Sequence, residues 1–350
     1  MKKIVVLFIL IANIISCQNK KVMEQEFEWE EKKAAPLGYP VEVYRGGFST
    51  NAGYFRSLVS SITTGKHGWG YGGGGMSSHK APIPDRLHTI WFSYAEGCFY
   101  EVDTEIDKLK MLALFREGYD WLDANGNIRH KVYDEIIAGF APGGVVVVWV
   151  AGSTQQVEIG RYQGRKIIIP QEEIDALPQE DKLLFDKENQ KEVMEDNSVI
   201  PQEVIEANKN KPIPFGLWDT YRKKYPWRLV FKFRGETKLY SNETVTMKLI
   251  NGERLDLFYN SFPMNTPFYQ AIPKEVLFSW EVSEGTFYGG GCEFEEEAIL
   301  SAFEKIFRDA EEDVTADLVI SVNQANTYMV VRLIGNGKEI VIPTTKVEAY

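Results

Sequence analysis

The chain has 350 residues, of which 44% are hydrophobic and 13% aromatic, enough apolar side chains for one large domain or two of ordinary size. It carries 39 basic and 50 acidic residues, for a net charge of −11, without a basic stripe. Because proteins bind nucleic acid largely through basic side chains that displace counterions from phosphates, this composition argues against a nucleic-acid partner.

The N-terminus has the pattern of a bacterial secretory signal. Two lysines precede an apolar run from Ile4 to Ile15, which is too short to span a membrane as a mature helix. Ser16 and Cys17 follow and resemble the bacterial lipobox, in which a small residue precedes a cysteine that is lipidated and becomes the new N-terminus. We expect residues 1–16 to be a signal peptide and Cys17 to carry the lipid. Acyl chains, at about 0.8 kcal/mol per buried CH₂ group, then hold the protein to a membrane.

Residues 17–34 are polar and charged, and they predict a tether without a core of its own. Gln18 and Asn19 follow Cys17, so the Asp that favours inner-membrane retention is missing, as is the acidic run typical of surface export. We therefore expect an outer-membrane protein, lipid-anchored and facing the periplasm.

Two stretches of the remaining chain resemble each other. "IPDRLHTIWFSYAEGCFY" occupies residues 83–100 and "IPKEVLFSWEVSEGTFY" occupies residues 272–288, each with six residues between its Pro and its Trp. Further matches occur in the same order at near-constant spacing: Arg45-Gly46 with Arg234-Gly235, Phe115-Arg116 with Phe307-Arg308, and Asp134, Val148 and Gly152 with Asp317, Val331 and Gly335. Self-similarity at this long spacing predicts two copies of one domain.

Each copy contains strand patterns, then a helix, then further strands. The strands 41–46 and 228–235 match in this interpretation, and the second helix has one apolar stripe, formed by Ile299, Ala302, Phe303 and Ile306. The predicted fold is α+β, an internal duplication of a mainly antiparallel sheet covered by one helix. We expect module 1 at residues 35–169, a charged and solvated helical linker at 170–213, and module 2 at 214–350.

Two cysteines remain after Cys17. Cys98 and Cys292 could form a disulfide in an oxidising compartment, which would stabilise the fold by roughly 5 kcal/mol in the chain-entropy model. The alternative is two separate buried thiols that behave as small apolar side chains.

No catalytic, metal or cofactor motif stands out. The glycine-rich segment 67–79 is followed by a predicted strand, whereas a phosphate-binding loop needs a helix N-terminus. His67, His79 and His88 have no metal-ligand spacing, and no Gly-x-Ser-x-Gly nucleophile elbow occurs. We therefore expect no cofactor, no bound metal and no catalytic residue.

Aromatic side chains are the better candidates for a functional surface. The glycine-rich loop would be mobile and expose Trp69 and Tyr71, and Trp218 and Tyr221 would lie near the seam between the copies. These four residues form the predicted contact surface.

The segments "APLGYPVEVYRGGF", "IPDRLHTIWFSYAEGCFYEVD" and "APGGVVVVWVAG" resemble the bacterial lipoproteins filed as domain of unknown function 2931, common in Bacteroidetes. The resemblance implies a lipoprotein and carries over no site residues. It also implies, for some members, immunity to contact-dependent toxins. The leading hypothesis is a protein-binding lipoprotein whose partner is a toxin or an envelope protein. A glycan-binding or structural envelope lipoprotein is the alternative, and an enzyme with an unrecognised site is the third.

Overall fold

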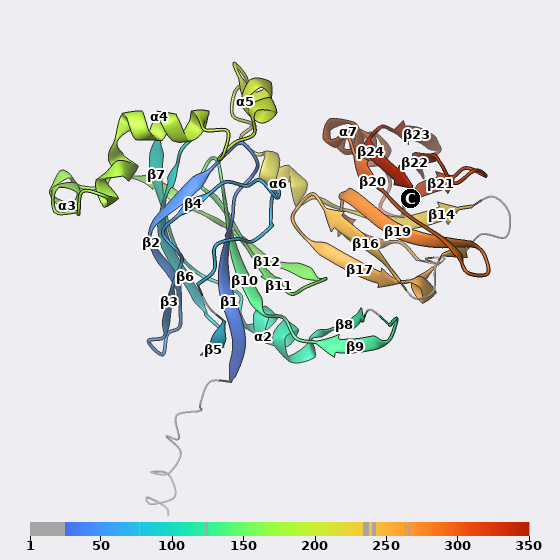
Figure 1. Ribbon diagram of the computed structural model, residues 1–350, viewed down its shortest axis with the longest axis horizontal. Coiled ribbons are helices and arrows are strands. Elements are labelled where there is room, and N and C mark those ends of the chain that lie inside the picture. The colour runs from blue at the N-terminus through green and yellow to red at the C-terminus, as the bar shows by residue number, and fades with distance from the viewer. Residues whose placement is uncertain are drawn as a thin grey trace, which may run out of the picture.

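The computed structural model describes residues 25–349 except 77, 124, 234–237, 240–242, 263 and 265, with the backbone only for 345–349. Strands dominate, most of them antiparallel, so the chain is an α+β protein as the sequence predicts. Two modules of strands lie side by side, with a helical segment at one end of the first (Figure 1). In the part of the chain described here, no helix is long and apolar enough to cross a membrane.

Module 1 is a sandwich of two sheets whose inner faces share one core. The first sheet has the order β5-β1-β10-β11-β12, with bounds His79–Pro82, Glu26–Ala34, Glu135–Ala141, Val145–Ala151 and Gln156–Gln163. The second has the order β3-β2-β6-β7-β13, with bounds Phe55–Ser57, Val41–Ser49, Arg86–Ser93, Cys98–Glu105 and Arg165–Ile167, and β4 (Ile62–Thr63) also pairs with β2. Between β7 and β10 the chain forms α2 (Lys108–Glu117) and the hairpin of β8 (Tyr119–Leu122) and β9 (Ile128–Lys131).

Module 2 is built in the same way. One sheet has the order β18-β14-β21-β22-β23, with bounds Phe268–Ala271, Lys224–Lys232, Ala316–Val322, Met329–Gly335 and Lys338–Ile342. The other has the order β24-β20-β19-β16-β17, with bounds Thr344–Ala349, Thr286–Phe294, Pro273–Ser283, Thr244–Leu249 and Arg254–Phe258; β15 (Lys238–Leu239) also pairs with β19. Helix α7 (Glu296–Phe307) follows β20, and its buried residues are the predicted stripe of Ile299, Ala302, Phe303 and Ile306.

The two modules share one strand connectivity. In each, the first strand lies between an antiparallel neighbour and a parallel one: β1 pairs with β5 and β10, and β14 pairs with β18 and β21. A cross-strand aromatic stack also recurs, with ring centroids 5.5 Å apart for Trp91 on Tyr100 and 5.8 Å for Trp280 on Tyr288. The structure thus shows the same strand order in both modules, and the internal duplication stays a prediction from the sequence.

The position of β1 corrects two expectations. Residues 26–34 do not belong to a tether, because they form a strand between β5 and β10 and the side chain of Trp29 is fully buried in the module 1 core. The equivalent of β1 in module 2 is β14, so matching residues 41–46 with 228–235 was wrong: β2 corresponds to β16. The matched Arg234-Gly235 pair lies outside the described residues.

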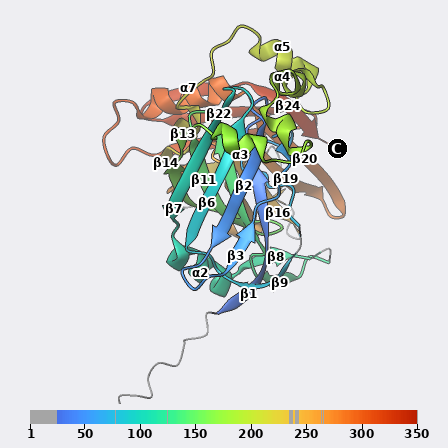
Figure 2. The same ribbon diagram turned by 90° about the vertical axis from the view of Figure 1, so that its left-hand side faces the viewer.

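The segment between the modules is not a solvated linker. It forms α3 (Gln171–Asp175), a 3₁₀ turn η1 (Asp181–Phe185), α4 (Lys187–Glu195) and α5 (Gln202–Asn208). Figure 2 shows α3 and α4 at one end of the β2-β6-β7 sheet. Apolar side chains of the linker and of this sheet make one buried cluster: Ile90, Phe92, Tyr94, Phe99, Ile169, Leu184, Val193, Val199 and Ile200. The acidic composition of the linker obscured this contact in the sequence, because most of its carboxylates are exposed, while Glu173 accepts hydrogen bonds from Tyr44 and Arg45 of β2.

The modules are joined along the first sheet of module 1. Every residue of β11 is buried, because one face of this strand lies in the module 1 core and the other packs against module 2. The sheet continues into module 2 through a single residue pair, Gln156 of β12 with Arg254 of β17. Ion pairs strengthen the junction, including Arg222 with Glu158 at 2.7 Å. The two modules are therefore packed together through a shared apolar core.

Candidate functional site

A cleft of about 410 Å³ lies at the junction of the modules and brings together three of the four predicted contact residues. Trp69 comes from the glycine-rich loop, whereas Trp218 and Tyr221 come from the short helix α6 (Leu217–Tyr221). The other described residues that line it are Pro36, Leu37, Tyr39, Gly68, Asn208, Lys211, Pro212, Pro214, Leu217, Leu249, Ile250, Lys274, Glu296 and Glu297. Its volume falls in the range of ligand-binding pockets.

Helix α6 forms one wall of the cleft and is fixed by contacts from both modules. The ring of Tyr39, in the β1–β2 connection, meets Trp218 edge to face at 5.4 Å. The Tyr221 hydroxyl donates a hydrogen bond to the Glu296 carboxylate at the start of α7. Burial, together with this carboxylate, raises the pKa of Tyr221, so the phenol stays protonated and keeps donating.

Trp218 and Tyr221 do not form an exposed contact surface. Only 1% of Trp218 and 6% of Tyr221 is exposed, because both side chains belong to the core shared by the modules. The sequence correctly placed these residues near the seam, but the packing of module 2 over β11 buries their rings. Their role is to shape the inner wall of the cleft.

The glycine-rich loop is anchored at the junction. Trp69 meets Trp149 of β11 edge to face, and the side-chain amide of Gln156 donates to the carbonyls of Gly70 and Gly252, both at 2.7 Å. A side chain at Gly70, which has φ +83°, would overlap the backbone of Gly252. These contacts hold Trp69 and Gly70 against the turn between β16 and β17, so this part of the predicted mobile loop is packed at the junction, whereas Tyr71 and Met76 further along are exposed.

Charged side chains surround the aromatic wall. Lys211 and Lys274 contribute two ammonium groups, and Glu296 and Glu297 contribute two carboxylates from the first turn of α7. All four residues are exposed, so they lie where a ligand would enter. The cleft thus combines an apolar interior with a rim of both charges.

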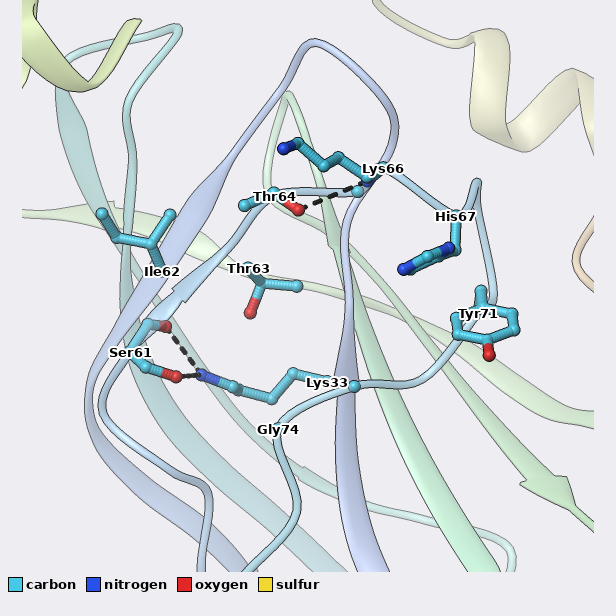
Figure 3. A pocket seen from close by; sticks show the side chains of 11 residues that line it. Lys33, Ser61, Ile62, Thr63, Thr64, Lys66, His67, Tyr71 and Gly74 are labelled. Atoms are coloured by element: carbon cyan, nitrogen blue, oxygen red, sulfur yellow. Dashed lines mark hydrogen bonds between the residues drawn. The ribbon is translucent and has the colours of Figure 1, made fainter. Parts of the chain in front are cut away.

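The fourth predicted residue, Tyr71, lies at a second and smaller cavity of about 130 Å³ (Figure 3). The described residues around it are Lys33, Ser61, Ile62, Thr63, Thr64, Gly65, Lys66, His67, Tyr71, Gly73 and Gly74. The same loop thus lines both cavities, with Gly68 and Trp69 at the cleft and Tyr71, more than half exposed, at this one.

Lys33 is the functional candidate that sequence reasoning missed. It lies on β1, is 1% exposed, and its ammonium group donates to the carbonyl of Val59 at 2.5 Å and to the carbonyl and hydroxyl of Ser61 at 2.7 and 3.0 Å. Burial lowers the pKa of this amine to about 8, against a smaller opposite effect of Glu42. The sequence did contain a signal. Phe27 and Trp29 alternate with charged residues, which predicts a strand with one buried face, and Lys33 falls on that same face.

Cys98 and Cys292 do not form a disulfide. Both thiols are free, and they belong to different modules: Cys98 lies on β7, whereas Cys292 lies on β20 with its sulfur 3.7 Å from that of Met329. Burial raises the pKa of both thiols, to about 12 for Cys292. The sequence left open a disulfide or two separate thiols, and the structure has two separate thiols.

Metal binding has no support from the geometry that is described. Among the described residues, no group of three or more His, Cys, Asp and Glu side chains is placed to hold an ion. The ring of His67 contacts Tyr71 at 4.8 Å, and His79 and His88 lie on different strands, facing Arg56 and Glu101 respectively.

The fold and the site define a class of protein: two similar α+β sandwiches packed into one body, with a mixed aromatic and charged cleft at their junction. The chain belongs to the family described as protein of unknown function (DUF2931), whose model matches residues 16–216. The match covers module 1 and the linker helices and ends just before α6. Searches of curated proteins and of solved structures gave no match.

Proposed function

We propose that this protein is a lipid-anchored binding protein that takes a protein partner at the cleft between its modules. The observation that carries the proposal is the composition of that cleft, where Trp69, Trp218 and Tyr221 meet from segments far apart in the sequence. Aromatic pockets with a polar rim are typical of the centres of protein interfaces, where a partner inserts one or two anchoring side chains.

A protein partner fits the cleft better than a glycan does. Sugar binding of the stacking type needs an aromatic ring with an open face, and the rings of Trp218 and Tyr221 are almost completely covered. Near the entrance, Leu37 is 38% exposed and Phe215, beside the lining residue Pro214, is 61% exposed. Exposed apolar side chains beside Lys and Glu residues suit a partner with a matching apolar anchor and charges of both signs.

The arrangement of acidic side chains at the cleft also fits partner binding better than glycoside hydrolysis. Glycoside hydrolases place two carboxyl groups on opposite sides of the bond that they cleave. The described acids at the cleft, Glu296 and Glu297, are neighbours on the first turn of α7, and Glu296 already accepts from Tyr221. This arrangement supports electrostatic contact with a partner and gives no acid–base pair across the cavity.

The proposed location is the periplasmic side of the outer membrane, through a lipid on Cys17. The support is the pattern of residues 1–17 and the short stretch, residues 18–25, that separates Cys17 from the start of β1. The partner that the family resemblance suggests is an incoming contact-dependent toxin, which the protein would neutralise by covering its active surface. An envelope protein is the alternative partner within the same proposal.

The test compares two matched substitutions in the lipid-free protein. Leu37→Glu places a charge at the entrance of the cleft, and Ile128→Glu places the same charge on the exposed strand β9 as a control. Proteins captured from envelope extracts and from toxin-delivering competitors are identified by mass spectrometry, and each is then titrated in purified form against both variants. We expect binding to weaken at least tenfold with Leu37→Glu and to be unchanged with Ile128→Glu.

The outcomes separate the hypotheses. A partner that binds the two variants equally would remove the cleft from the proposal. Capture of polysaccharide fragments in a manner sensitive to Leu37→Glu would replace the protein partner with a glycan. A toxin that wild-type protein inhibits and that the Leu37→Glu variant fails to inhibit would establish an immunity function.

A further inference from the structure

The cavity above Lys33 differs in chemistry from the cleft, because its described lining contains basic and hydroxyl side chains but no carboxylate. Lys33 lies at its base, and the exposed residues Lys66 and His67 belong to the loop above it. Figure 3 shows the Thr63 hydroxyl directed toward the space beside Lys33 and the His67 ring directed into the same space. The described side chains that line the cavity therefore include basic groups and no acidic one, and the acids that interact electrostatically with these lysines are Glu42 for Lys33 and Asp196 for Lys66.

The ammonium group of Lys33 has three hydrogen-bond acceptors, but among the described residues no carboxylate forms an ion pair with it within 4 Å. All three partners of the ammonium group, the carbonyls of Val59 and Ser61 and the Ser61 hydroxyl, are neutral oxygens. Glu42 on β2 is the acid whose charge affects Lys33, and its carboxylate accepts a hydrogen bond from Tyr94. A buried charge without a close counterion is costly, and an anion in the adjoining cavity would offset that cost.

We infer that the cavity above Lys33 is a binding site for a small oxyanion such as sulfate, phosphate or a carboxylate group. Lys33 supplies the fixed positive charge at its base, Thr63 supplies a hydroxyl donor, and His67 covers the anion from the loop, with Lys66 at the rim. The volume of about 130 Å³ is that of roughly four water molecules, enough for one tetrahedral anion and too small for a nucleotide. This site is separate from the proposed partner cleft.

A purely structural role for Lys33 makes a different prediction. In that case the amine only ties the 59–61 segment to β1, and anions have no effect on it. In the anion site, sulfate binding requires the protonated amine, so affinity falls as pH rises through the pKa of Lys33, which burial lowers to about 8. Sulfate keeps a charge of −2 between pH 7 and pH 9.5, whereas the charge of phosphate changes near pH 7. Sulfate is therefore the better probe.

The experiment is an isothermal titration of the lipid-free protein with sulfate, at constant ionic strength with chloride as the replaced ion. Wild type is measured at pH 7 and pH 9.5, beside Lys33→Met, Thr63→Val and Lys80→Met. The last variant removes one exposed lysine from β5 and controls for net charge. We expect at least tenfold weaker binding for Lys33→Met and for wild type at pH 9.5, about threefold weaker binding for Thr63→Val, and no change for Lys80→Met.

Thr63→Val keeps the shape of the side chain and leaves the contacts of Lys33 in place. If Lys33→Met does not fold, Thr63→Val and the comparison of wild type at pH 7 and pH 9.5 still test the anion site. Absence of sulfate binding to wild type at about 10 mM would overturn the inference. So would equal losses in Thr63→Val and Lys80→Met, because general charge would then explain the binding. Parallel titrations with phosphate and acetate distinguish a tetrahedral anion from a carboxylate.

Discussion

Trp69 in the glycine-rich loop meets Trp149 on β11 edge to face, with ring centroids 5.0 Å apart and an interplanar angle of 80°. The contact links a segment that the sequence predicts to be mobile to β11, a strand in which every residue is buried. The Trp149 indole in turn donates to the carbonyl of Asn251 in module 2, at 3.2 Å. The two indoles therefore connect the loop, module 1 and module 2.

Removing the indole ring of Trp69 should destabilise the junction between the modules. We expect Trp69→Ala to lower the free energy of unfolding by about 2 kcal/mol, because a half-buried indole and its edge-to-face contact are lost. Tyr71→Ala, two residues away and more than half exposed, should cost about 0.5 kcal/mol. Urea unfolding followed by circular dichroism measures both, and equal costs would mean that the Trp69 contact adds nothing.

The close approach of the loop to module 2 can be tested at Gly70. Its φ of +83° disfavours any side chain, and an added Cβ would lie 2.5 Å from the Cα of Gly252. Gly53 has a similar φ of +95° but open space around it. Gly53→Ala should therefore cost about 1 kcal/mol from backbone strain alone, and Gly70→Ala about 2 kcal/mol more from the overlap. Similar melting temperatures for the two variants would contradict the packed loop.

Lys33 should give the protein a distinctive alkaline response. Its pKa is about 8 in the folded protein and 10.5 in the unfolded chain, so unfolding takes up a proton between these values. The contribution of Lys33 to stability should therefore rise with pH from 8 to 10.5, by about 3 kcal/mol in total. The difference in unfolding free energy between wild type and Lys33→Met, measured in urea across this window, isolates the effect. A constant difference would show that the amine titrates normally.

Thiol reactivity checks the separate cysteines. In the lipid-free protein without Cys17, we expect Ellman's reagent to detect two thiols after denaturation, with or without prior reduction, because no disulfide is present. In the native protein the half-buried Cys98 should react slowly, and the buried Cys292 should stay unreactive. A second thiol that appears only after reduction would indicate the disulfide.

The lipid anchor is tested at Cys17. In a cell that processes lipoproteins, Cys17→Ala should move the protein from the membrane pellet to the soluble periplasmic fraction, because the acyl chains are its only proposed membrane contact. Radiolabelled palmitate should enter the wild type and not the variant. Equal membrane fractions for both would exclude the anchor.

Patterns local to one element predicted structure well. The apolar stripe of α7 and the run of valines in β11 need only their own periodicity and a nearby turn to be identified, and both are present. The sequence also grouped Trp69 with Trp218 and Tyr221, which the cleft unites. The family resemblance is confirmed as well.

Features that depend on distant partners were missed. The charged residues Glu31 and Lys33 made β1 resemble a tether. In the structure Arg56 forms an ion pair with Glu31 at 3.8 Å, and the carbonyls of Val59 and Ser61 accept hydrogen bonds from Lys33. These partners come from more than twenty residues away, so composition alone cannot indicate them. The exposure of Trp218 was overestimated for a similar reason, because it depends on how module 2 packs against β11.

The direction of β1 has a consequence for how the protein would stand on a membrane. The strand starts at Glu26, at the opposite end of the body from α5, α6 and α7 (Figure 1), and its nine residues cover about 30 Å. Eight residues, 18–25, separate the proposed acyl group on Cys17 from that start. Lys33, near the far end of this strand, lines the smaller cavity, and Pro36 and Leu37, just after the strand, line the cleft. With the lipid at the near end, both cavities would lie on the part of the body away from the membrane surface.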